Sequence, residues 1–283
     1  SNLGIEVLDG GTFGKFFALN ELNLSSNKLT STKNVVAALQ TVRPLILNLS
    51  YNNLGSSDHD RPTLYDDRSY KQWKTFLFDS RYFWSVDLSH NSLLGIGIDF
   101  EAVHLNLSNN LIKCHSAIES RRFYGKPIYV GNLDLSHNFI DCQDLFFTSN
   151  INTLDMSYNK LKGLDADGFL RRLPLLTKLN LTHNYIRYIH PRAFEETWRL
   201  QFLDLQFNQI RTIYKQVWAP LPAIRYIDLS SNRLEYLEWD NITFFRKPAF
   251  EIEVDVRNNS KVQVWSSNSI YFNFCNGYGY FIL

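Results

Sequence analysis

The sequence lacks the features that mark several common protein classes. Its 283 residues include only three cysteines, too few for a fold built on disulfides, and the odd number leaves at least one without a partner in this chain. No run of about 18 apolar residues occurs, which excludes a transmembrane helix from this stretch. Neither sign of charge is in excess, with 29 basic and 28 acidic residues. The composition therefore gives no reason to expect nucleic acid as a partner.

Motifs for catalysis and for cofactors are missing as well. There is no phosphate-binding loop, no dinucleotide fingerprint and no paired-carboxylate motif. Neighbouring serine and histidine residues, such as Ser89 and His90, would point to opposite sides of a strand and could not act as nucleophile and base. We expect no cofactor and no catalytic residue. A recognition module is favoured over an enzyme whose site the motifs do not reveal.

What the sequence does contain is a repeat. The pattern apolar-x-apolar-x-x-Asn occurs ten times, at steps of 25, 39, 19, 28, 21, 25, 24, 24 and 27 residues. The ten motif asparagines are Asn27, Asn52, Asn91, Asn110, Asn138, Asn159, Asn184, Asn208, Asn232 and Asn259. Repetition at such a period predicts stacked units that share one core.

The residues of the motif indicate the structure of each unit. Alternating leucines such as Leu203 and Leu205 predict a short strand with one apolar side, which stacking in a parallel sheet would bury. The motif asparagine is expected to turn inward and to bond backbone groups left unpaired by the turn. A second apolar set is expected to close the convex return arm: Leu161, Leu164 and Phe169; Ile186, Ile189 and Phe194; Ile210, Ile213 and Val217.

The motif resembles that of leucine-rich repeat proteins over nearly the whole chain. The 24-residue unit with phenylalanine in its return arm, as in HPRAFEETWRLQFLDLQFN, is similar to the extracellular animal type found in Toll-like receptors and neuronal adhesion proteins. The resemblance implies an α/β-type solenoid: a curved arc of about ten repeats with a parallel concave sheet and a mostly irregular convex side. It also implies the ectodomain of a cell-surface receptor that binds an extracellular protein, or alternatively a secreted immune or matrix protein. Any membrane attachment would lie outside this chain.

Residues 1–283 are predicted to form a single repeat domain, a fragment of a longer chain. The 39-residue step after Asn52 indicates an inserted loop over residues 55–73, which is either a binding loop or a tolerated surface insertion. Residues 262–283 lose the consensus and are predicted to be a degenerate repeat or part of a C-terminal cap.

The candidate ligand site is the concave face of repeats six to nine. The position between the two leucines is always asparagine or aspartate, so that stripe alone does not locate a site. Exposed aromatic side chains beside it would be typical anchors of a protein interface. The predicted site residues are Tyr158, Phe202, Asp204, Phe207, Tyr226 and Asp228. The alternative is that Phe207 folds over a neighbouring strand.

Histidine recurs at one repeat position, in His90, His137 and His183. A strand without histidine lies between the strands of successive histidines, which would place their rings about 10 Å apart. That distance is too large for the histidines to bind one zinc ion. We expect no metal site.

Two kinds of covalent modification are predicted. Glycosylation acceptors occur at Asn23, Asn48, Asn106, Asn180, Asn241 and Asn258. Cys114 and Cys142 each lie four residues after a motif asparagine in adjacent repeats, which predicts a separation of about 5 Å and a disulfide. Cys275 would then be the odd cysteine.

Overall fold

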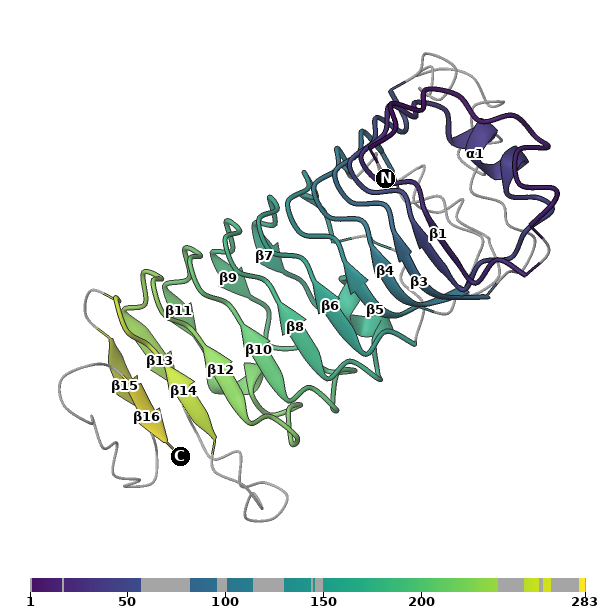
Figure 1. Ribbon diagram of the computed structural model, residues 1–283. Coiled ribbons are helices and arrows are strands. Elements are labelled where there is room, and N and C mark those ends of the chain that lie inside the picture. Colours follow the sequence, from purple (N-terminus) through teal and green to yellow (C-terminus); the bar gives the residue numbers. More distant parts are fainter. Residues whose placement is uncertain are drawn as a thin grey trace. The chain divides into compact units, whose positions relative to one another are not determined.

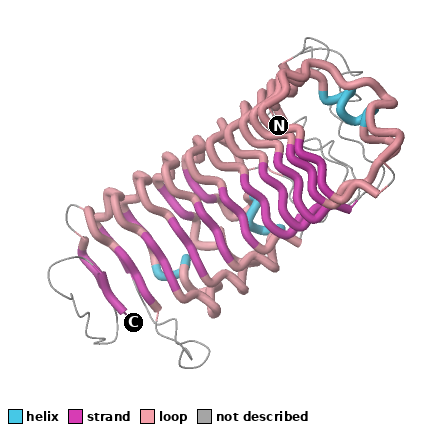
Figure 2. Tube along the Cα trace, viewed as in Figure 1, coloured by secondary structure: helices cyan, strands magenta, loops and turns pink. Residues whose placement is uncertain are grey.

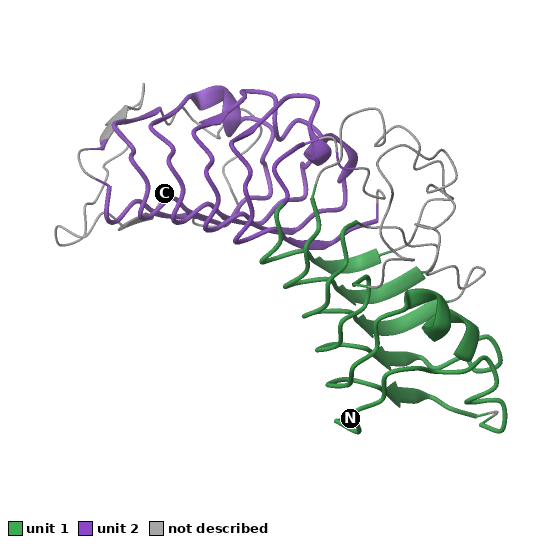
Figure 3. Ribbon diagram, turned by 90° about the horizontal axis from the view of Figure 1, so that it is seen from above, with its two compact units in different colours: residues 1–139 green, residues 140–283 purple. Residues whose placement is uncertain are grey.

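The structure is a computed structural model that describes residues 2–16, 18–56, 82–95, 101–113, 130–143, 145, 150–238, 252–259, 262–265 and 280–282. Strands and turns make up most of these residues, and helices are few and short (Figure 2). The chain forms two compact units, residues 1–139 and residues 140–283 (Figure 3).

The first unit contains a parallel sheet whose strands pair in chain order (Figure 1). These strands are β1 (Glu21–Asn23), β2 (Ile46–Asn48), β3 (Tyr82–Asp87), β4 (Glu101–Asn106) and β5 (Val130–Asp134). Helix α1 (Thr32–Ala38) links β1 to β2, and its N-cap Ser31 accepts a hydrogen bond from the backbone of Asn34. Such a cap satisfies an otherwise unpaired N–H group of the first turn.

The second unit repeats this arrangement. Its sheet strands β6 (Thr153–Asp155), β8 (Lys178–Asn180), β10 (Phe202–Asp204), β12 (Tyr226–Asp228) and β14 (Glu253–Asp255) pair in parallel. Strand β16 (Tyr280–Ile282) pairs antiparallel with β14. Short strands lie beside this sheet: β7 (Gly163–Leu164) pairs with β9 (Tyr188–Ile189), and β13 (Tyr236–Glu238) lies between β11 (Thr212–Ile213) and β15 (Gln263–Trp265). The return arms include the 3-10 helices η3 (Phe169–Arg172) and η4 (Lys215–Val217).

The core follows the predicted pattern. The alternating leucines are buried, with Leu203 and Leu205 both 0% exposed. The nine apolar residues predicted for the return arm are buried too, at 5% exposure or less. Burial of these side chains supplies the main stabilising term of a repeat, at roughly 25 cal/mol for each Å² of apolar surface removed from water. The predicted parallel solenoid of leucine-rich repeats is confirmed.

The motif asparagines form the predicted ladder. In the eighth repeat, Asn208 Nδ2 donates to the carbonyls of Leu181 at 2.9 Å and Leu205 at 3.1 Å, and its Oδ1 accepts from the N–H of Ile186 at 3.0 Å. The same bonds to the preceding repeat recur at Asn184 and Asn232. Each asparagine thus joins its own turn to the repeat before it, as expected for buried backbone groups that need partners.

The two predicted irregular segments fall largely outside the described residues. Of the inserted loop 55–73, the structure describes Gly55 and Ser56. Gly55 has φ of +85°, and a Cβ there would lie 2.9 Å from the carbonyl oxygen of Ser92, so the start of the insertion requires glycine. Of residues 262–283, the structure describes β15 and β16 with Val262. The single-domain assignment and the two alternatives for this end stay predictions.

Candidate functional site

The central stripe of the concave face has a structural role. In all ten repeats the Oδ1 atom of the asparagine or aspartate accepts a hydrogen bond from the backbone N–H two residues later, at 2.8–3.1 Å. This is an Asx turn, which ends each strand. Asparagine and aspartate close this turn more strongly than serine or threonine does, so the turn explains the stripe without any ligand.

Two of the predicted aromatic residues lie on adjacent strands of the second unit. Phe202 on β10 is directly opposite Tyr226 on β12, and Asp204 is opposite Asp228. The Phe202 ring is 39% exposed, and the ammonium of Lys178 lies 5.2 Å from its centroid. Tyr226 is half-buried. The pair therefore presents an apolar ring and a partly covered phenol side by side.

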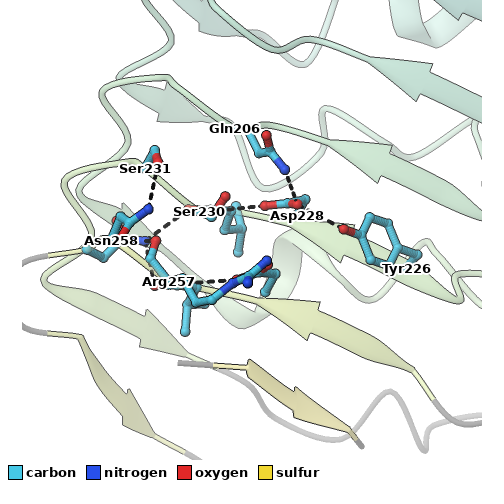
Figure 4. A network of polar contacts seen from close by, with 11 residues as sticks. Gln206, Tyr226, Asp228, Ser230, Ser231, Arg257 and Asn258 are labelled. Atoms are coloured by element: carbon cyan, nitrogen blue, oxygen red, sulfur yellow. Dashed lines mark hydrogen bonds and ion pairs between the residues drawn. The ribbon is translucent and has the colours of Figure 1, made fainter. Parts of the chain in front are cut away.

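Asp228 is buried, with an exposed fraction of 1%. Its carboxylate accepts hydrogen bonds from the Tyr226 hydroxyl at 2.9 Å, from the Ser230 N–H and from the Gln206 amide (Figure 4). Through these hydrogen bonds Asp228 holds the side chains of Tyr226 and Gln206 in place. On the next strand, the buried carboxylate of Asp255 is bound by the Arg257 guanidinium.

Burial also affects the ionisation of this surface. Loss of solvent raises the pKa of Asp204 to about 6, the negative charges of Asp228 and Asp155 add to the increase, and the Gln206 N–H opposes it. Burial, followed by the hydrogen bond to Asp228, raises the pKa of Tyr226 above its ordinary value. Asp204 therefore becomes negatively charged only at a higher pH than an exposed aspartate would.

Asp204→Asn is expected to stabilise the protein at pH 8. The folded-state pKa of Asp204, about 6, lies above the value of about 3.9 for an unfolded chain, so the native state binds more protons between these values. Stability is therefore lost as pH rises through this window. Asparagine keeps the turn, as Asn180 does at the same position on β8.

Urea unfolding at pH 8 and at pH 4 checks this expectation, with the advantage of the variant present at pH 8 and absent at pH 4. The reverse variant Asn180→Asp, which adds a carboxylate between those of Asp155 and Asp204, should lower stability at pH 8. A variant Asp204→Asn that is equally stabilised at both pH values would contradict the assigned cause.

The other two predicted aromatic residues lie in turns rather than on strands. Tyr158 and Phe207 directly precede their motif asparagines, both have positive φ of 54° and 52°, and they are 45% and 47% exposed. Their rings stack on the two faces of His183, with centroid distances of 4.1 and 4.3 Å. Phe207 thus covers a neighbouring repeat, and the six predicted residues form two groups, one on the strands and one along the turns.

The predicted modification sites differ in their surroundings. Asn23 and Asn258 are exposed, Asn48, Asn106 and Asn180 are half-buried, and Asn241 lies outside the described residues. Cys142 is disulfide-bonded. Both cysteines that could be its partner, Cys114 and Cys275, lie outside the described residues, so the pairing with Cys114 stays a prediction, as does glycosylation.

Sequence reasoning missed an exposed aromatic cluster in the first unit. Trp84 on β3 is 52% exposed and contacts the ring of His104 on β4, which is hydrogen-bonded to Asn132 on β5. Alternation counted back from Val86 places Trp84 inside. Instead, the N–H groups of Trp84 and Ser85 both donate to the carbonyl of Leu45, a bulge that turns the tryptophan outward. The same double donation recurs in the regular repeats, for example from Gln201 and Phe202 to Thr177. Simple alternation therefore fails at this position of the repeat in general.

The described side chains offer no group of three or more His, Cys, Asp or Glu residues placed to hold a metal ion. None of the described helices is long and apolar enough to cross a membrane.

Comparison with known proteins agrees with this architecture. The Leucine rich repeat family matches residues 174–234, and no curated protein matches the sequence. The leucine-rich repeat domain of APL1B is 20% identical, with a TM-score of 0.54, and the match covers 94% of this chain and 76% of that one. The structure of the Toll–Spatzle complex of Drosophila is 19% identical, with a TM-score of 0.62, and the match covers 95% of this chain and 38% of that one. A leucine-rich repeat protein of Bacteroides thetaiotaomicron is 17% identical, with a TM-score of 0.56, and the match covers 90% of this chain and 33% of that one.

The last two matches span about a third of those longer chains, and at these identities they establish the fold alone. Ten Asx turns, ten motif asparagines and the stacked parallel strands agree with them. The chain has the leucine-rich repeat fold.

Proposed function

We propose that this chain is a non-enzymatic protein-recognition module, the ectodomain of a Toll-like or adhesion-type cell-surface receptor, which binds an extracellular protein through the concave face of its second unit. The observation that carries the proposal is the pair of Phe202 and Tyr226 on adjacent strands. Tyrosine and phenylalanine offer large contact areas, and few rotatable bonds become fixed on binding.

The surroundings of this pair support recognition. The hydrogen bond from Tyr226 to the buried Asp228 fixes the phenol before any partner arrives, and such pre-organisation lowers the entropy lost on binding. Lys178 and Asp204 lie beside the rings and can select a partner by charge. A role for Asp204 and Asp228 in binding is part of the proposal, with Asp228 acting through Tyr226.

The extracellular location is inferred from the repeat type and from the resemblance to the Toll protein. The structure of the Toll–Spatzle complex describes a protein bound to another protein. A secreted, soluble immune or matrix protein is the alternative, and residues beyond Leu283 would distinguish the two. A membrane span followed by a cytoplasmic domain would indicate a receptor.

The double variant Phe202→Ser/Tyr226→Ser is expected to lose most of its affinity for a partner found in a panel of extracellular domains. Each interface anchor contributes about 2 kcal/mol, so the loss should reach a hundredfold or more. Surface plasmon resonance measures this, with Trp198→Ser/Tyr214→Ser as a matched control, because those aromatics are similarly exposed but lie outside the concave face. Equal affinities of wild type and Phe202→Ser/Tyr226→Ser would show that binding lies elsewhere.

A further inference from the structure

One side of the second unit is built from three outward-facing positions of each repeat. Burial alternates along the chain from the residue before each motif asparagine to the third residue after it. In the eighth repeat Phe207 and Arg211 are exposed and Gln209 is half-buried, whereas Asn208 and Ile210 are buried. The positions one before, one after and three after the asparagine therefore point outward together.

These positions stack in register from repeat to repeat. The N–H of Phe207 donates to Ser230, that of Arg187 to Lys162, and that of Glu235 to Arg211. Each contact joins equivalent segments of neighbouring repeats, which run beside one another between the main strands and the short strands β7, β9, β11 and β13 (Figure 1). Neighbouring segments lie about 4.8 Å apart, so the outward side chains form one continuous surface.

This surface is strongly basic. We call it the basic flank, and its members are Tyr158, Lys160, Lys162, His183, Tyr185, Arg187, Phe207, Gln209, Arg211, Ser231, Arg233 and Glu235. At these positions the four repeats contain five lysines or arginines, all exposed, and one acid, Glu235, whereas the exposed Asp141 holds the same position at the start of the unit. Glu235 lies 3.8 Å from Arg211, and the Arg187 Nε donates to the neutral Gln209. The five positive charges of the flank therefore stand against one negative charge among its own members.

The aromatic stack on this flank also favours a negatively charged ligand. In the stack of Tyr158, His183 and Phe207 the ring faces cover one another, so much of the exposed surface of the rings is their edges. An aromatic ring has a negative face and a positive edge. Edges beside lysine and arginine therefore form a surface that attracts anions and apolar groups at once.

The flank is a local feature that the composition conceals. On the concave face of the same unit, the central stripe carries Asp155, Asp204, Asp228 and Asp255. Basic side chains on one side and acidic ones on another leave the chain near neutrality, at +1 overall. The equivalent described positions of the first unit hold only Lys28 and Lys113 as basic residues, and Lys28 is paired with Glu6 at 3.3 Å.

We propose that the basic flank binds an acidic segment of a protein, in which aspartate or glutamate alternates with apolar side chains. Carboxylates would pair with Arg187, Arg211 and Arg233, whose planar guanidinium groups match the two oxygens of a carboxylate. Apolar side chains would pack against the ring stack. This surface is separate from the concave site proposed above, so a partner could occupy both.

A polyphosphate or a sulfated polysaccharide fits the flank less well. Such chains carry charge at every unit, whereas here the basic side chains Lys162, Arg187 and Arg211 form one row that ends at Glu235, beside a separate row of rings. Alternating chemistry suits an extended peptide, whose successive side chains differ.

The test uses a dye-labelled peptide of alternating glutamate and phenylalanine, with fluorescence anisotropy as the readout. Arg187→Glu/Arg211→Glu/Arg233→Glu is expected to weaken binding at least about tenfold at low salt, and the wild-type affinity should fall as salt rises. The control Arg172→Glu/Arg199→Glu/Arg225→Glu changes the net charge equally with exposed arginines outside the flank and should stay within about twofold. Circular dichroism verifies folding, and Arg187→Gln/Arg211→Gln/Arg233→Gln gives a milder variant if charge reversal unfolds the chain.

Further peptides separate the contributions. A glutamate–serine peptide should bind more weakly than the glutamate–phenylalanine one, and Tyr158→Ser/Phe207→Ser should abolish that difference. Equal losses in the flank and control variants would overturn the proposal, as would tighter flank-dependent binding of single-stranded DNA or heparin. Phe202→Ser/Tyr226→Ser should bind the acidic peptide like wild type, so the flank and the concave site can fail independently.

Discussion

Phe194→Ala is expected to lower the free energy of unfolding by about 3–5 kcal/mol, because a buried phenylalanine leaves a cavity that its surroundings fill only partly. Phe194 is 0% exposed in the return arm of the seventh repeat. In a solenoid each repeat depends on its neighbours, so the loss should be felt in the adjacent repeats as well.

Urea denaturation measures this loss, and hydrogen exchange locates it. The matched control is Trp198→Ala, four residues further along the same arm, where the side chain is 46% exposed and the expected loss is below about 1 kcal/mol. A similar loss in both variants would mean that the return arm does not pack as described.

Asn208→Ala is expected to cost about 2–6 kcal/mol, because at least two buried backbone groups lose their partners at about 1–3 kcal/mol each. The groups are the carbonyl of Leu181 and the N–H of Ile186, both from the preceding repeat. Asn208→Asp keeps an acceptor for Ile186 but loses the donors, so it separates the two contributions.

Chemical denaturation of both variants beside Asn152→Ala, whose side chain is exposed, provides the comparison. A cost for Asn208→Ala no greater than that for Asn152→Ala would show that the ladder contributes little.

Much of the fold could be predicted because each repeat is a local pattern with one physical solution. The spacing of Leu203, Leu205 and Asn208 identifies a strand and its turn, and stacking is then the way to bury the leucines. Even the central stripe follows from the backbone, since its asparagines and aspartates close Asx turns. Trp84 departs from simple alternation because its backbone forms a bulge, as the backbone of Gln201 does at the same position of the eighth repeat.

The candidate site was predictable only in part. Phe202 and Tyr226 lie side by side on strands, as strand alternation requires. Tyr158 and Phe207 do not join them, because a positive φ rotates each residue out of the plane of the strand and onto His183. The burial of Asp228 depends on Gln206 and Tyr226 from two different repeats. Such contacts between repeats do not appear in the motif of any single one.

The row of positive φ values has a consequence for how these repeats can evolve. Ten non-glycine residues directly before the motif asparagines share φ values of 52–56°. Their side chains differ widely, as Ser26, Tyr51, His90, Asn109 and Phe207 show. The backbone there is fixed by the ladder and is indifferent to which side chain it carries, although each non-glycine residue costs a little conformational energy. Mutation can therefore exchange one side chain for another at regular intervals while the scaffold stays the same. The residues directly before the motif asparagines therefore form a surface whose binding specificity can change by one substitution at a time.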